Sequence, residues 1–217
     1  MRLRDLQIGT NLSEPPSRLE INKDSWCISC HYLSKLPQLE TGQIAKAYIE
    51  LFDVLPRERR KSFSALGNCG FESKFDFDHY STLCPHSKKR VLLDHLHGGL
   101  LEIAEELNWP KEPFENAYQA VLADNILYSE FWKTPKWNRT RTLRGQVHFC
   151  FDIDRLEFNA VAFDKTGAEV ARKHLVTFPR AIDSDHYDTL IKYGWKDDHT
   201  FFLEGRPAWH HWEVTFP

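Results

Sequence analysis

A single apolar stripe in the middle of the chain restricts the fold more than any other feature. Between residues 86 and 109, in HSKKRVLLDHLHGGLLEIAEELNW, large aliphatic side chains recur every three or four residues. This spacing gathers them on one side of an α-helix, which has about 3.6 residues per turn. The stripe consists of Leu93, Leu96, Leu100, Ile103 and Leu107. We therefore expect a long amphipathic helix that ends before Pro110.

The chain changes character after Pro135. Residues 145–178 are rich in β-branched and aromatic side chains, and a turn sequence, Asp-Lys-Thr-Gly, interrupts them at 164–167. Residues 198–217 alternate in the same way around Gly205-Arg206-Pro207. These patterns predict an antiparallel β-meander followed by a final hairpin.

The first third of the chain gives mixed signals. Residues 17–33 alternate in two pieces around the polar triplet Asn22-Lys23-Asp24, which indicates an opening β-hairpin. Residues 41–56 carry apolar side chains at helical spacing between a capping residue, Thr41, and Pro56. They predict a helix.

Two further segments complete the pattern. Residues 71–80, FESKFDFDHY, alternate aromatic and charged side chains and predict a strand, while residues 113–132 predict a second long helix. The expected fold class is α+β, with an N-terminal β-hairpin, central helices and a C-terminal antiparallel β-meander. A chain of 217 residues most simply forms a single domain, 1–217, with a helical subregion at 41–132 and a β-rich subregion at 143–217.

The net charge and the cysteine content limit which functions and locations are expected. The net charge of −3 gives no general attraction to nucleic acid or to an anionic membrane. No apolar run approaches membrane-spanning length and the start lacks the apolar region of a signal peptide, so we expect a cytoplasmic protein. Five cysteines, an odd number, fit reduced thiols better than a disulfide framework.

Residues 27–31 read Cys-Ile-Ser-Cys-His and match the attachment signature of c-type haem. On a strand of the predicted hairpin, Cys27 and Cys30 would point to opposite faces and could not hold one group from the same side. We therefore expect no cofactor at this motif.

Histidine and cysteine pairs elsewhere raise the question of a metal. His95 and His97 lie two residues apart on the predicted helix, so their side chains diverge by about 200° unless Gly98-Gly99 breaks it. Further candidate ligands, namely Cys69, Cys84 and His86, have long and irregular spacing for zinc. We expect no bound metal.

Acidic and aromatic side chains supply the candidate binding surface. On predicted strands, Asp76 with Asp78 and Asp152 with Asp154 each form an acidic row, because residues at i and i+2 share a face. In the predicted last strand, Trp209, His211 and Glu213 share a face in the same way. The predicted partner-binding residues are therefore Asp76, Asp78, Asp152, Asp154, Trp209, His211 and Glu213.

A basic stretch, KWNRTRTLRG at 136–145, offers a different surface. Arg139, Arg141 and Arg144 lie close in sequence to Trp132 and Trp137, and arginines beside aromatic rings suit single-stranded nucleic acid. The net negative charge of the chain makes this the least favoured of the functions considered.

Nucleophile-elbow, zinc-protease and phosphate-loop motifs are all absent from the sequence. In general architecture, from RGQVHFCFDIDRLEFNAVAFDKTGAEV to the terminal AWHHWEVTFP, the chain resembles the immunity proteins encoded beside bacterial polymorphic and contact-dependent toxins. The resemblance implies a non-enzymatic protein that binds a toxin domain and blocks it, and acidic contacts would speed the capture of a basic nuclease. It rests on no motif, so it assigns no residues.

One alternative function is an enzyme, a metal-dependent hydrolase or nuclease. It would draw on His95, His97, Asp76 and Asp78, and also on His79.

Overall fold

The computed structural model describes residues 2–10, 15–55, 63–179, 190–205 and 210–217. The chain divides into two compact units, Met1–Tyr128 (unit 1) and Ser129–Pro217 (unit 2), and each is described by itself. Helices and strands are both abundant, which confirms the α+β class. No helix in the described ranges is both long and apolar enough to cross a membrane.

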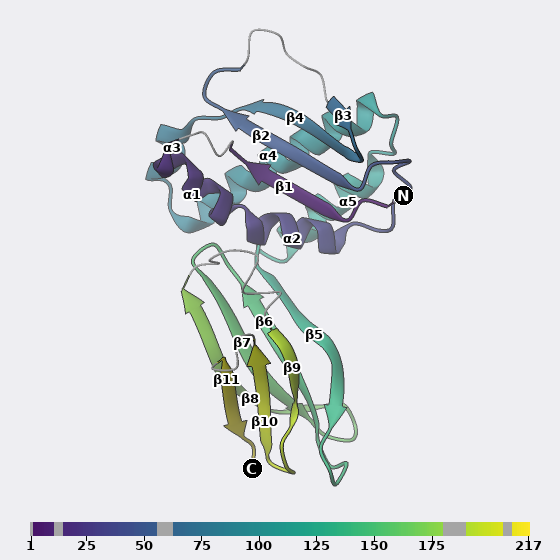
Figure 1. The fold of residues 1–217 in the computed structure, drawn as a ribbon, viewed down its shortest axis with the longest axis vertical. Coiled ribbons are helices and arrows are strands. Elements are labelled where there is room, and N and C mark those ends of the chain that lie inside the picture. Colours follow the sequence, from purple (N-terminus) through teal and green to yellow (C-terminus); the bar gives the residue numbers. More distant parts are fainter. Residues whose placement is uncertain (1, 11–14, 56–62, 180–189, 206–209) are drawn as a thin grey trace. The chain divides into compact units, whose positions relative to one another are not determined.

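Unit 1 combines a four-stranded sheet with helices. In the sheet, ordered β1-β2-β4-β3, strands β1, β2 and β4 are parallel and β3 is antiparallel to β4. Helix α4 contacts three of these strands, and α2 and α5 contact α4 (Figure 1). The elements are β1 (Asp5–Gly9), α1 (Pro16–Asp24), α2 (Trp26–Lys35), β2 (Lys46–Phe52), β3 (Phe63–Ala65), β4 (Asn68–Lys74), α3 (Phe77–Thr82), α4 (Pro85–Glu106) and α5 (Glu112–Ala123).

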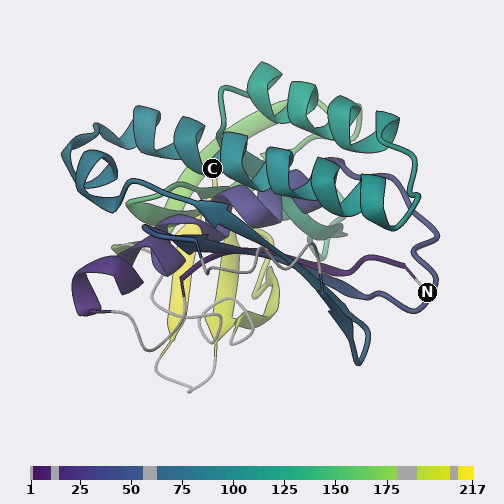
Figure 2. The same cartoon turned by 90° about the horizontal axis from the view of Figure 1, so that it is seen from above.

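The long predicted helix is confirmed as α4, and Gly98-Gly99 does not break it. Four side chains of the stripe, Leu93, Leu96, Leu100 and Ile103, are fully buried and pack on one side of the sheet, the side on which Figure 2 shows α4 and α5, while Leu107 is half-buried after the end of the helix. Gly99 sets the distance between the two layers, because a Cβ atom there would overlap Ile49 in the middle of β2. Burying each leucine of the stripe contributes about 1.5–3 kcal/mol to stability.

The predicted N-terminal hairpin is wrong, because residues 16–35 form α1 and α2. Strand β1 pairs with β2 in parallel, and a parallel pair needs a crossover of a dozen or more residues, which the two helices provide. Side chains tie this crossover to the end of β1: Asn22 bonds both the amide and the carbonyl of Thr10, and the Ser25 hydroxyl donates to the carbonyl of Ile8. The alternation of residues 26–32 is also compatible with a helix, and the crossover selects the helix.

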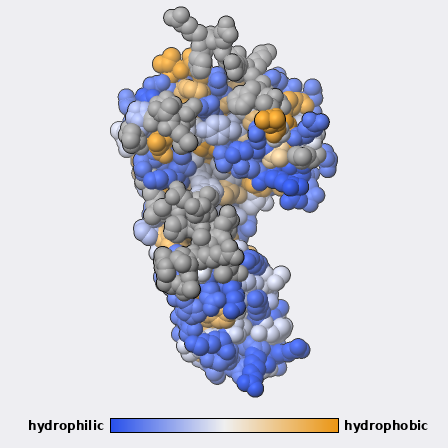
Figure 3. Space-filling view, in the orientation of Figure 1, coloured by the Kyte–Doolittle hydropathy of each residue, from blue (hydrophilic) through white to orange (hydrophobic). Residues whose placement is uncertain are grey.

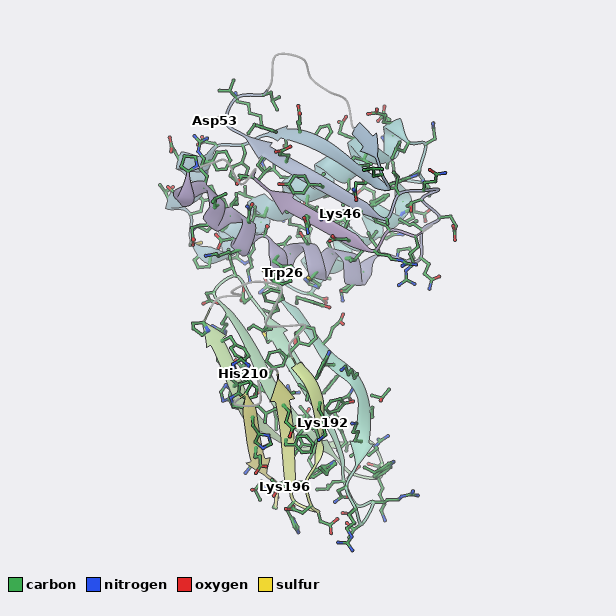
Figure 4. The ribbon with its side chains drawn as sticks, viewed as in Figure 1. Trp26, Lys46, Asp53, Lys192, Lys196 and His210 are labelled. Atoms are coloured by element: carbon green, nitrogen blue, oxygen red, sulfur yellow. The ribbon has the colours of Figure 1, made fainter. Side chains whose placement is uncertain are left out.

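The helix predicted over 41–56 is also wrong, because β2 occupies Lys46–Phe52. Its buried residues are Ala47, Ile49 and Leu51, which alternate with half-buried side chains on the other face. One of these is Lys46, labelled in Figure 4, and it forms an ion pair of 3.1 Å with Asp5. Pairing with β1 and β4 on both edges overrides the helical spacing that the isolated segment suggests.

Two predicted elements are partly right. The strand expected over 71–80 is β4, but it ends at Lys74 and α3 follows. The helix expected over 113–132 is α5, which ends at Ala123, and β5 begins at Tyr128. Between β4 and α3, the Asp76 side chain caps the new helix. Between α5 and β5, Asn125 and Ile126 adopt positive φ angles that end the helix.

Unit 2 is a sandwich of two antiparallel sheets, and the predicted C-terminal meander is confirmed. A four-stranded sheet, β5-β6-β7-β8, faces a three-stranded sheet, β11-β10-β9. The 164–167 turn forms as expected, with Gly167 at a φ of +90°. The turn of the last hairpin, 206–209, lies outside the described residues. The strands are β5 (Tyr128–Trp137), β6 (Arg144–Phe151), β7 (Arg155–Phe163), β8 (Glu169–Pro179), β9 (Leu190–Trp195), β10 (Thr200–Gly205) and β11 (His211–Thr215).

Aromatic side chains fill the space between the two sheets. Phe201 of β10 lies edge-on to Trp195, with 5.3 Å between ring centroids, and Phe178 of β8 meets Trp212 of β11 at 5.7 Å. Gly145 of β6 lies opposite Phe201, and a Cβ atom there would overlap the Phe201 ring. The alternation of β6 follows from this packing, since its inward residues are buried and its outward residues are half-buried. This core fixes which side chains lie on the two outer faces of unit 2.

Candidate functional site

The outer face of the three-stranded sheet gathers charged side chains around one aromatic ring. Along β10, Phe201 and Leu203 are buried, so Phe202 and Glu204 lie on the opposite, outward face. Neighbouring strands add side chains in register, because Glu204 pairs with both Lys192 and His211, and Phe202 pairs with Glu213. We call this surface the polar β9–β11 face and define it as Lys192, Lys196, Phe202, Glu204, His211 and Glu213.

Short contacts connect the charged groups of this face. The two ring nitrogens of His211 lie 2.8 Å from a Glu213 oxygen and 3.3 Å from a Glu204 oxygen. Lys196 reaches Glu213 at 3.0 Å, and Lys192 reaches Glu204 at 3.4 Å. Hydrogen bonds from His211 and Lys196 hold the pKa of Glu213 below its usual range. The Glu213 carboxylate is therefore ionised and paired at neutral pH.

The Phe202 ring lies among these charges. The His211 ring stacks on it at an interplanar angle of 14°, with 6.0 Å between centroids. The Lys192 ammonium lies over the same ring, 5.2 Å from its centroid. Figure 3 shows the described surface on this side of unit 2 as mostly hydrophilic, and Figure 4 labels Lys192 and Lys196 on β9 and beside its end. The Phe202 ring is thus half-buried and surrounded by charged side chains, an arrangement that is common in protein–protein interfaces.

The sequence predicted part of this face. His211 and Glu213 do share the outward side of β11, as the alternation of the segment indicates. Trp209, predicted beside them, lies outside the described residues. Sequence reasoning missed Lys192, Lys196, Phe202 and Glu204, although the alternation in TFFLEG could have placed the last two on one face.

The acidic row predicted at Asp152 and Asp154 does not form on a strand. Strand β6 ends at Phe151 and β7 begins at Arg155, so both aspartates belong to the turn between them. The Asp152 carboxylate accepts the amide of Ile153 at 2.7 Å, and Asp154 lies 3.6 Å from Arg155. Aspartate favours turns for this reason, since its short side chain bonds nearby backbone amides.

The second acidic row, Asp76 and Asp78, is also not on a strand. Asp76 is the N-cap of α3 and accepts the amide of His79 at 2.9 Å, while Asp78 lies in the first turn of the same helix. Both positions favour carboxylates, because the first helical turn has free amides and a positive dipole end. Their presence is thus accounted for by the local structure of unit 1.

The two histidines of α4 diverge, as a continuous helix requires. His95 lies 2.9 Å from the hydroxyl of Ser73 on β4, whereas His97 lies 2.9 Å from the hydroxyl of Tyr32 on α2. Burial lowers the pKa of both histidines. Among the residues that the structure describes, no three His, Cys, Asp or Glu side chains gather closely enough to hold a metal ion.

The cysteine-containing motifs have separate places in unit 1. Cys27 is buried on α2, and burial raises the pKa of Cys30 to about 12. His31 is buried against Tyr128 and lies 3.1 Å from Asp124. Cys27 and Cys30 lie one turn apart on a helix, so the prediction that they point to opposite faces of a strand is wrong.

The two other cysteines of unit 1, Cys69 and Cys84, are unlike each other. Burial raises the pKa of Cys69 on β4 to about 12. Cys84 is exposed immediately before α4, and its pKa is lowered mainly by a hydrogen bond with Ser87. Like His86, Cys84 belongs to no cluster of ligands within the described ranges.

Comparison with known proteins adds no family: no protein-family model, curated protein or solved structure matches this chain.

Proposed function

We propose that this chain is a non-enzymatic inhibitor that binds a protein partner through the polar β9–β11 face. The observation that carries the proposal is the Phe202 ring, held on a sheet surface among paired charges of both signs. Interfaces draw most of their binding energy from a few such aromatic anchors, and the surrounding polar residues exclude water from them.

The pairing of charges on this face favours binding. Ordering a long side chain during association costs about 0.5–1.5 kcal/mol. Lys192, Lys196 and both glutamates already have partners in the free chain, so part of this cost is absent. Because the pairs are exposed, they add little to stability, with a median of about 0–1 kcal/mol for such pairs. Their arrangement is better explained by recognition than by folding.

The partner that we propose is a toxin domain, and the chain would then be an immunity protein. The resemblance in architecture to immunity proteins suggested this function, and the polar face adds a surface on which a toxin could dock. Asp152 and Asp154, in a turn of the same unit, are candidates for an additional contact with a basic nuclease. Asp76 and Asp78 of unit 1 are weaker candidates, because capping of α3 accounts for them.

The geometry favours this proposal over a metal-dependent hydrolase or nuclease. Such an enzyme would need His95, His97, Asp76 and Asp78 around one ion. The two histidines instead bond to groups on different elements, β4 and α2. No observation in the described part of the chain favours the enzyme.

A growth experiment tests the function. A bacterial host would express the product of the gene adjacent to the one that encodes this chain, with and without the chain. We expect the neighbouring product to arrest growth alone and to be harmless alongside the chain. Harmless expression in both cases, or arrest in both, would contradict an immunity function for this pair.

Charge reversal then tests the face. Lys196→Glu should weaken binding to the purified partner by about tenfold, which corresponds to about 1.4 kcal/mol. The double variant with Glu213→Lys restores an ion pair within the chain but in the opposite direction. If the partner contacts these charges directly, the double variant still binds weakly. If Lys196→Glu acts only through folding, the double variant regains the affinity of the unmodified chain. Lys173→Glu, an exposed lysine on β8, is the matched control and should bind like the unmodified chain.

A further inference from the structure

The outer face of the other sheet of unit 2 carries aromatic rings around an arginine. Phe131 of β5 is 42% exposed, and its ring centroid lies 5.5 Å from that of Phe163 on β7. Phe163 pairs across the strands with Arg144 of β6. The Arg144 guanidinium in turn lies 5.3 Å from the ring centroid of Trp137, which is 44% exposed. Three aromatic rings and one cation thus share a single outward surface.

The buried side-chain amide of one asparagine fixes the turn that follows β5. Asn138 is only 3% exposed, and its Oδ1 accepts the amides of Thr142 and Leu143 at 2.9 and 3.1 Å. Its Nδ2 donates to the carbonyl of Asp198, on another turn of the unit, at 3.0 Å. The 138–143 turn is therefore tied to the body of the sandwich, and it presents Arg139 and Arg141, both exposed.

Two aspartates of the neighbouring turns bond to backbone amides and not to these arginines. Asp198 accepts the amide of Thr140 at 2.7 Å, and Asp164 accepts the amides of Thr166 and Ala168 at 2.8 and 3.0 Å. Within the described part of the chain, neither Arg139 nor Arg141 forms an ion pair. This distribution is the reverse of that on the polar β9–β11 face, where each carboxylate meets a cation.

We propose that this surface binds single-stranded nucleic acid. We call it the arginine–aromatic face and define it as Phe131, Trp137, Arg144 and Phe163 together with the exposed Arg139 and Arg141 of the turn that follows Trp137. Unpaired guanidinium groups attract phosphates, and exposed rings beside them stack on bases, which are accessible only in single strands. The chain as a whole is acidic, so the attraction is local and the binding is weak and sensitive to salt. This inference is independent of the proposed inhibitor function.

Fluorescence anisotropy of the full chain with labelled 12-nucleotide oligothymidylate and oligouridylate tests the proposal. If three arginines each neutralise one phosphate, log K should fall against log salt with a slope of about −2, since each single-strand phosphate contributes about 0.7. Arg139→Gln with Arg141→Gln should reduce the slope to about −0.7. Trp137→Ala should weaken binding about tenfold, and Trp137→Phe should weaken it less. Stronger binding of one probe would identify DNA or RNA as the ligand.

The matched control is Arg155→Gln with Lys173→Gln, which removes two exposed cations from the same unit at other places and should leave both probes bound as before. Circular dichroism of every variant confirms that the fold is intact. The proposal fails if neither oligonucleotide binds at about 50 mM salt, or if the control variant loses as much affinity as the arginine variant. It also fails if polyglutamate of equal charge competes as well as the oligonucleotides, because the surface would then select acidic polypeptides.

Discussion

The two units of this chain differ in how many ionisable side chains they bury. Unit 1 has exposed ion pairs but also buries several of these groups and bonds them to one another: Asp24 lies 2.9 Å from Tyr80, and Tyr32 lies 2.9 Å from His97. In the described part of unit 2 such side chains are fewer: Asn138 and Asn159 are buried but do not ionise, and the buried Tyr193 hydroxyl donates to the carbonyl of Thr134. Its charged groups lie on the outer faces instead. The difference indicates that the polar groups of unit 1 hold its layers together, and that those of unit 2 are available to ligands.

Packing in unit 1 gives the largest predicted effect. Gly99→Val would drive a branched side chain into Ile49 and should lower the free energy of unfolding by about 3 kcal/mol. The adjacent Gly98→Ala meets nothing within 4 Å and should raise it by up to about 1 kcal/mol, because alanine favours helix over glycine. Hydrogen exchange followed by mass spectrometry would report the change in unit 1. Equal effects of the two variants would contradict the tight fit of α4 on the sheet.

The next largest difference in stability is expected between loss of a buried hydrogen bond in unit 1 and loss of an exposed ion pair in unit 2. Tyr80→Phe removes the donor to the buried Asp24 carboxylate and should destabilise unit 1 by about 2 kcal/mol. Lys196→Ala removes an exposed partner of Glu213 and should change the stability of unit 2 by less than about 0.5 kcal/mol. Urea unfolding of both variants measures the two changes in the free energy of unfolding. A larger loss for Lys196→Ala would contradict the division between structural and ligand-binding groups.

Mild acid should affect unit 1 more than unit 2. Burial lowers the pKa of His95 and His97 in unit 1, so the unfolded state takes up protons at a higher pH than the folded state does. Stability therefore falls as the pH drops through the ordinary histidine pKa of about 6.5, and levels off below the folded pKa values. In unit 2, burial lowers the pKa of one such histidine, His148, so the expected loss is smaller.

Stronger acid should affect both units, because hydrogen bonds also hold the pKa of Asp53 and Asp124 in unit 1 below the usual range. In unit 2, hydrogen bonds hold the pKa of Asp164, Asp197 and Glu213 below the usual range, so these carboxylates stabilise the folded state above the unfolded pKa. That stabilisation is lost as the pH falls below about 4 and through the lowered pKa values. Pulsed hydrogen exchange, with incubation at each pH and labelling at one common pH, would resolve the two units. Identical pH profiles for the two units would count against the comparison.

The elements that the sequence predicts correctly are those whose pattern has only one interpretation. The stripe from Leu93 to Ile103 cannot lie on one face of a strand, and the meander of β6 to β8 is too rich in β-branched and aromatic residues for helices. Residues 26–32 fit both periods, and the choice between them depends on β1 pairing in parallel with β2, a contact between distant parts of the chain.

The same limit applies to the candidate site. Alternation places His211 and Glu213 on one face because that information is local. Their contacts with Glu204 and Lys196 depend on the register of three strands, which no local pattern gives. The predicted acidic rows are wrong for a related reason. Asp76 begins α3 as its N-cap and Asp152 lies in the turn after β6, and each bonds to a backbone amide where a continuing strand was expected.

The central claim is that the polar β9–β11 face, and not the arginine–aromatic face, binds the protein partner. Titration calorimetry of the purified partner with two matched variants, Phe202→Ala and Phe131→Ala, tests it most directly. Phe202→Ala should weaken binding by about thirtyfold, equivalent to about 2 kcal/mol, while Phe131→Ala should change it by less than twofold. Loss of binding with Phe131→Ala and normal binding with Phe202→Ala would contradict the account.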